Sequence, residues 1–86
     1  MTLLKDCKAP FDWFTALMWE NLAKPENQAK KNWGDMGSEF LLGMIQHEYA
    51  QIIQALKSNK PSTIVKDCAD LGNYAMMLAD LFREGS

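Results

Sequence analysis

The sequence is poor in the residues that usually mark catalytic nucleophiles and zinc sites. Its 86 residues include one histidine and two cysteines, Cys7 and Cys68. Neither cysteine lies in a CxxC pair or a Cys/His array, so a zinc site is unsupported. With one histidine and no GxSxG segment, a Ser–His–Asp hydrolase is equally unsupported. The chain also has no glycine-rich strand-to-helix loop, so a P-loop or Rossmann site is unsupported.

Long hydrophobic runs and an excess of positive charge are missing as well. No run approaches the roughly 18 apolar residues that span a membrane, and the first ten residues show no signal-peptide pattern. The net charge is -2 and the pI about 5.2, so polymeric nucleic acid is not an expected partner. These absences predict a cytoplasmic protein that binds no membrane and no nucleic acid polymer, although a small anionic ligand is still allowed.

Apolar residues, by contrast, are abundant for so short a chain. They make up 48% of the sequence and include three Trp, four Phe and six Met. The length predicts a single domain over residues 1–86, and a domain of this size buries only a modest fraction of its surface. We therefore expect an apolar face that packs against a second subunit.

The apolar spacing predicts helices and no strands. Residues three or four apart repeat over 11–23, 38–58 and 62–83, with Pro10 in the first turn of the first helix and Asp35 or Ser38 capping the second. The segment KPENQAKKNWGDMGSE is expected to be a loop. Short connections between long helices favour antiparallel neighbours. We predict an all-α fold with three main antiparallel helices per chain.

Carboxylates occur inside or beside the rows that these helices need for packing. Glu48 lies on a row of the second helix with Leu41, Met44, Ile45, Ile52 and Ala55. In the third helix the predicted core row consists of Cys68, Leu71, Ala75, Leu78 and Phe82, and Asp67 and Asp70 border it. A single Glu in such a place is often a boundary residue whose carboxylate reaches water. An ionised carboxylate that stays buried needs a partner.

Antiparallel packing of the second and third helices would bring Glu48 and Gln51 near Asp67 and Asp70. Three acids and an amide at one place repel each other unless a cation lies among them. Oxygen ligands of this kind suit Mg²⁺, with Mn²⁺ as the alternative. His47 points to another side of its helix and is expected at the surface.

The sequence around these acids resembles that of the MazG-like all-α nucleotide pyrophosphohydrolases. The segments IQHEYAQIIQAL and IVKDCADLGNYAMMLAD are similar to the ExxE and ExxD helices of that family, whose acids bind Mg²⁺. Upstream, KKNW and MWENL also resemble one branch of the family, so the resemblance covers roughly residues 15–81. Two motif positions differ, because Gln51 and Asp67 stand where the family has Glu.

The resemblance implies a Mg²⁺-dependent hydrolase that converts a nucleoside triphosphate, possibly a deoxynucleotide, into a monophosphate and pyrophosphate. It implies Glu48, Asp67 and Asp70 as catalytic metal ligands with Gln51 as a neutral fourth. It also implies a homodimer or homotetramer in which helices of two chains complete a bundle. The alternative function is a MazG-fold oligomer with a weakened site that binds nucleotides or other proteins, and Gln51 favours it.

Four further residues are candidates for substrate contacts. Lys30 and Lys31 would bind phosphates, with a solvated pair of loop lysines as the alternative. Trp33 would stack on a base, or else anchor the loop on the core. Asn73 lies one turn after Asp70, and the resemblance implies a role for it near the metal or the sugar.

Overall fold

The chain folds into helices that form a hairpin with one further helix across it. The computed structural model describes the backbone of residues 2–83 and the side chains of residues 6–27 and 32–83. This part of the chain contains no strand and consists of α1 (Thr2–Leu22), the 3₁₀ segment η1 (Pro25–Asp35), α2 (Ser38–Lys57) and α3 (Pro61–Phe82). The predicted all-α class is confirmed. Over the same residues, no helix combines the length and the hydrophobicity needed to cross a membrane.

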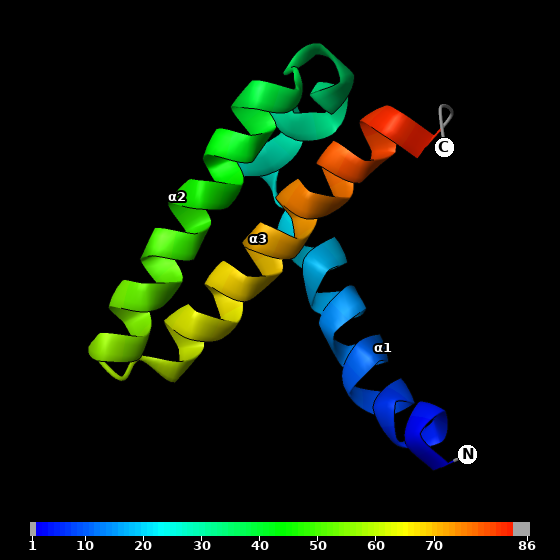
Figure 1. The fold of residues 1–86 in the computed structure, drawn as a ribbon, viewed down its shortest axis with the longest axis vertical. Coiled ribbons are helices and arrows are strands. Elements are labelled where there is room, and N and C mark those ends of the chain that lie inside the picture. The colour runs from blue at the N-terminus through cyan, green and yellow to red at the C-terminus, as the bar shows by residue number, and fades with distance from the viewer. Residues whose placement is uncertain (1, 84–86) are drawn as a thin grey trace.

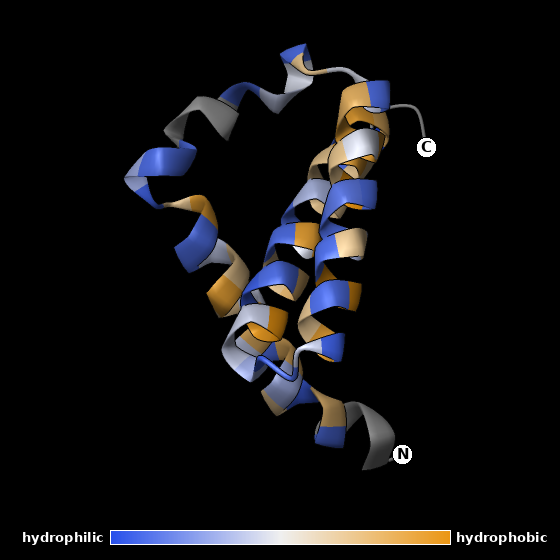
Figure 2. Ribbon diagram, turned by 90° about the vertical axis from the view of Figure 1, so that its left-hand side faces the viewer, coloured by the Kyte–Doolittle hydropathy of each residue, from blue (hydrophilic) through white to orange (hydrophobic). Residues whose placement is uncertain are grey.

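Only two of the helices are antiparallel neighbours. α2 and α3 run side by side in opposite directions, whereas α1 crosses α3 and its N-terminal half projects away from the pair (Figures 1 and 2). The connection between these two helices is short, since α2 ends at Lys57 and α3 begins at Pro61. Within it, Asn59 adopts a positive φ of 51°, which reverses the direction of the chain. The expectation of three antiparallel helices was therefore too simple for α1.

The start of the first helix differs from the prediction. α1 begins at Thr2 rather than near residue 11, and Pro10 lies inside it rather than in its first turn. A proline inside a helix removes one backbone hydrogen bond and usually ends or kinks the helix. Here Lys8 and Asp12 form an ion pair of 2.7 Å across Pro10, and such a pair favours helix on both sides.

The predicted loop contains 3₁₀ structure, and the predicted cap of α2 was wrong. η1 covers residues 25–35 and is interrupted at Asn32, whose ψ is 46°. The residue that precedes α2 is Gly37, and neither Asp35 nor Ser38 caps the helix through its side chain. Gly37 has a φ of 83°, which glycine adopts without the steric penalty of a side chain. Backbone geometry therefore sets the start of α2.

The core lies between α2 and α3, and the row that α3 contributes to it differs from the prediction. Leu41, Tyr74 and Met77 form the buried centre. The row predicted for α2 holds, since Leu41, Glu48 and Ala55 are buried. On α3 the predicted row holds only in part. Leu78 packs against the core and Cys68 and Leu71 are half-buried, but Ala75 and Phe82 are exposed. The buried residues of α3 are Asp67, Ala69, Asn73, Tyr74 and Met77. Because both α2 and α1 pack against α3, the buried part of its surface is wider than one apolar row and includes polar residues.

Candidate metal centre and polar cleft

Three carboxylates from the two hairpin helices meet at one place. α2 supplies Glu48, and α3 supplies Asp67 and Asp70, which lie one turn apart on the same face. One oxygen of each carboxylate lies within 4.8 Å of the corresponding oxygens of the other two. Glu48 is 9% and Asp67 7% exposed, so two of the three acids are held in the seam between the helices.

The protein compensates the charges of Glu48 and Asp67 poorly. Oδ2 of Asp67 is buried and has no hydrogen-bond partner, an arrangement that costs about 1–3 kcal/mol or more for a charged group. Burial raises the pKa of Glu48 above its ordinary value, and the negative charges of Asp70 and Asp67 raise it further. A cation placed among the three carboxylates would offset both the unpartnered oxygen and the repulsion between the charges.

Asp70 has two partners from the protein. Lys66 donates from Nζ to Oδ2 over 3.1 Å, and Asn21 donates from Nδ2 to Oδ1 over 3.3 Å. The hydrogen bond to Asp70 and the charge of that residue raise the pKa of the Lys66 ammonium. Asn21 is 5% exposed and lies in the last turn of α1, so the end of α1 helps to fix the orientation of Asp70.

The cluster opens into a polar cleft of about 240 Å³. Glu48 and Asp70 lie on its wall with two lysines, Lys24 and Lys66, and the cleft is completed by Asn21, Glu26 and Asn27. The residues come from the end of α1, the start of η1 and the two hairpin helices. A cleft with both acids and lysines on its walls suits a ligand that carries a divalent cation and anionic groups together.

Sequence reasoning missed most of this cleft. Lys66 carried a signal, because a lysine four residues before Asp70 on a helix is in reach of that carboxylate. Asn21 and Asn27 carried none, since their places depend on how α1 crosses α3. Asn27 donates from Nδ2 to the backbone carbonyl of Asn21 over 2.6 Å, which connects η1 to the end of α1.

Gln51 is described by the structure, whereas the side chains of the two loop lysines are not. Gln51 is exposed on α2 and is not among the residues that line the cleft. Its role as a neutral ligand stays a prediction. The side chains of Lys30 and Lys31 lie outside the described residues.

Trp33 anchors η1 to the C-terminal half of α3. Its indole Nε1 donates to Oδ2 of Asp80 over 2.9 Å, and its ring packs against the core. Asp80 is ten residues beyond Asp70, which is roughly 15 Å along a helix. This geometry favours the loop anchor over a base-stacking residue.

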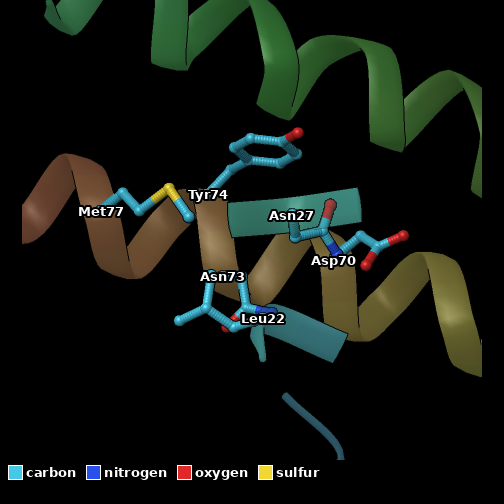
Figure 3. A pocket seen from close by; sticks show the side chains of 6 residues that line it. All are labelled: Leu22, Asn27, Asp70, Asn73, Tyr74 and Met77. Atoms are coloured by element: carbon cyan, nitrogen blue, oxygen red, sulfur yellow. The ribbon is translucent and has the colours of Figure 1, made fainter. Parts of the chain in front are cut away.

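Asn73 lies beside the cluster but is occupied by a structural contact. It is 5% exposed and donates from Nδ2 to the backbone carbonyl of Met18 over 2.9 Å. With Asp70 and Asn27 it lines a small cavity of about 10 Å³, in which Figure 3 shows Tyr74 turned towards α2 and the Asp70 carboxylate turned away from Asn73. The cavity has room for about one water molecule.

The three carboxylates are therefore a group that could hold a metal ion, next to a cleft that has two lysines on its walls. Comparisons of the chain with protein family models, with curated proteins and with solved structures found no match.

Proposed function

We propose that the protein is a Mg²⁺-dependent nucleoside triphosphate pyrophosphohydrolase that releases a nucleoside monophosphate and pyrophosphate. The observation that carries this proposal is the meeting of Glu48, Asp67 and Asp70 within 4.8 Å beside a polar cleft. The MazG-like resemblance of the two helices that supply these acids gives the reaction and the kind of substrate.

The donor set fits Mg²⁺ or Mn²⁺. All three side chains offer oxygen, which is the ligand that these hard ions prefer. The orphaned buried Oδ2 of Asp67 would gain a partner, and a cation would offset the repulsion that raises the pKa of Glu48. Gln51, whose carbonyl oxygen is a fourth candidate donor, is exposed one turn beyond Glu48.

In this proposal the three carboxylates hold the cation, and the cleft holds the phosphates. Bound Mg²⁺ supplies neutralisation of phosphate charge and Lewis-acid activation of water. Asn21 keeps Asp70 oriented through its hydrogen bond of 3.3 Å. Glu48, Asp67 and Asp70 carry the negative charge that retains the cation, and the cleft beside them is polar enough to accept a triphosphate chain.

The test is a screen of the purified protein against ribo- and deoxynucleoside triphosphates, with Mg²⁺ and with a chelator. We expect ³¹P NMR to show pyrophosphate and a monophosphate, and we expect the chelator to abolish turnover. Inorganic phosphate with a diphosphate as the products would place the attack at the γ-phosphorus and refute the proposed reaction.

Variants test the assignment of ligands. Glu48→Ala and Asp70→Ala should each lower turnover by about 100-fold or more, the scale on which loss of one electrostatic group at a reacting centre acts. Asp12→Ala is the matched control, because Asp12 pairs with a lysine on exposed α1. Full activity of either cluster variant would show that these acids are not the ligands.

A second function is favoured by one observation. Gln51 is neutral and exposed, which leaves the cluster one carboxylate short of the family pattern. A helical oligomer that binds a nucleotide or another protein without hydrolysis is the alternative. Binding of a nucleoside triphosphate with Mg²⁺ but without turnover would select it.

A further inference from the structure

Lys66 forms an ion pair with one acid of the carboxylate cluster, and its side chain also reaches the cleft. Its Nζ lies 3.1 Å from Oδ2 of Asp70, while 59% of the side chain remains exposed. The same residue lines the cleft together with Glu48 and Asp70. A long side chain that is anchored only by an exposed i, i+4 pair exchanges partners readily, since such pairs contribute about 0.3–0.5 kcal/mol.

Acidic residues outnumber lysines around the cleft, which explains why Lys66 pairs with Asp70. The cleft carries two lysines against three carboxylates, and the buried Asp67 adds a fourth acid behind the wall. An anionic ligand is repelled from such a site when no further cation is present. A divalent cation at the cluster reverses this balance, and it also competes with Lys66 for the oxygens of Asp70.

We propose that Lys66 exchanges its partner: it pairs with Asp70 in the free protein, and it binds an oxygen of a polyphosphate when a divalent cation occupies Glu48, Asp67 and Asp70. This inference rests on the proposed function, because it assigns the phosphate-binding lysine of the same site. It places that role on α3, four residues before a metal ligand, rather than on Lys30 and Lys31. The ligand chemistry is a chain of phosphoanhydride groups, which ammonium donors bind as a strong charge-assisted acceptor.

The experiment measures binding without catalysis. Tripolyphosphate is titrated into the full-length protein by calorimetry, with Mn²⁺ and with a chelator, and Mn²⁺ alone is titrated separately. Wild type should bind tripolyphosphate only with Mn²⁺. Lys66→Met should weaken that binding by about tenfold, as expected for loss of one charge-assisted contact, and should strengthen binding of Mn²⁺ alone, because a competing positive charge has been removed. Lys66→Arg should keep most of the tripolyphosphate affinity.

Lys8→Met is the matched control, since Lys8 forms the same i, i+4 pair with Asp12 on exposed α1 and should change neither affinity. Equal tripolyphosphate affinity of Lys66→Met and Lys8→Met would overturn the proposal, and so would a loss that appears in Lys24→Met instead. Hydrolysis of a nucleoside triphosphate together with either result would leave the proposed function intact. Binding that depends on Lys66 without any hydrolysis would support the exchange and contradict the reaction.

Discussion

Glu48 and Asp67 are acidic residues at positions where a helical hairpin usually has apolar side chains. Both are at least nine-tenths buried, and Asp67 holds an oxygen without a hydrogen-bond partner. The apolar centre of the same hairpin consists of Leu41, Tyr74 and Met77. The conflict between packing and charge at Glu48 and Asp67 is the feature that an added cation would resolve.

Replacement of Glu48 by Gln should stabilise the metal-free protein at neutral pH. Because the pKa of Glu48 in the folded state lies above its ordinary 4.5, the folded state takes up this proton at a higher pH than the unfolded state. The contribution of this group to the free energy of unfolding therefore rises as the pH falls through the raised pKa, and levels off near 4.5. Urea unfolding with a chelator at pH 7 and pH 5 should show a gain for Glu48→Gln at pH 7 that shrinks at pH 5.

Glu20→Gln serves as the control for that comparison, since Glu20 is exposed on α1 and its neutralisation should change stability little. A gain of about 1 kcal/mol would raise the melting temperature by about 4–8 °C in a domain of this size. Lower stability of metal-free Glu48→Gln at pH 7 would show that the protein itself compensates the charge.

The sequence was sufficient to predict that the three acids lie close together, and insufficient to predict the residues around them. Glu48, Asp67 and Asp70 follow from helical spacing on two neighbouring helices, which local sequence determines. Asn21 reaches Asp70 only because α1 crosses α3, and no local pattern reports a crossing. The buried row of α3 was predicted only in part for the same reason, since a row drawn from apolar residues alone omits Asp67 and Asn73.

At the scale of the elements, the contact between α1 and α3 positions one wall of the cleft. Asn73 binds the carbonyl of Met18, and Asn21 binds Asp70. Gly72 permits the close approach, because a Cβ at this position would lie 3.2 Å from Sδ of Met18 and 3.3 Å from a ring carbon of Phe14. Gly72 matters because it lacks a side chain, and not because of its backbone conformation, since its φ is not in the left-handed region.

Gly72→Leu should therefore lower the free energy of unfolding by about 1–3 kcal/mol through overpacking, and should weaken the hold of Asn21 on Asp70. Gly43→Leu is the matched control, because a Cβ at Gly43 meets nothing within 4 Å and leucine is the better helix former by up to about 1 kcal/mol. Chemical denaturation of both variants measures the difference. Equal stabilities would show that α1 does not pack tightly on α3.

Trp33→Phe tests the role of η1. The anchoring geometry predicts a loss of about 1 kcal/mol of stability, because phenylalanine cannot donate to Asp80, which is itself partly exposed. The Michaelis constant for a nucleotide substrate should remain close to that of wild type. Trp19→Phe, at a residue that is 70% exposed, should leave stability unchanged. A stability of Trp33→Phe equal to that of wild type, with a raised Michaelis constant, would favour base stacking.

The molecule as a whole is more extended, and exposes more surface, than a compact domain of the same length. Its radius of gyration is 14.3 Å, against about 12 Å for a compact domain of this length. The accessible surface is 6384 Å², against roughly 5,200 Å² for a monomer of this mass. Large apolar residues contribute to that surface, and those that are at least 60% exposed are Phe11, Trp19, Tyr49, Leu56 and Phe82. The projecting half of α1 (Figure 1) lacks a covering element within the described chain.

We therefore expect the protein to self-associate into a homodimer at least, with the exposed apolar residues in the interface. Light scattering at micromolar concentration should give a mass of twice the 9.8 kDa of one chain or more. Trp13→Glu, at a residue that is 57% exposed on α1, should shift the mass towards that of one chain if α1 contributes to the interface. A monomer mass for wild type would rule the association out. The surplus of apolar residues was evident from the sequence, whereas which surfaces remain open depends on the path of α1.

Titration with Mn²⁺ followed by electron paramagnetic resonance tests most directly whether Glu48, Asp67 and Asp70 form a divalent cation site. Wild type should bind a single Mn²⁺ per chain in this cluster. Asp67→Asn keeps the shape of the side chain but removes the charge of the orphaned oxygen, and should weaken binding by about tenfold or more. Asp12→Asn, at an exposed acid on α1, should bind as wild type does. Equal affinities in all three proteins, or no bound Mn²⁺ in wild type, would contradict a cation site at this cluster.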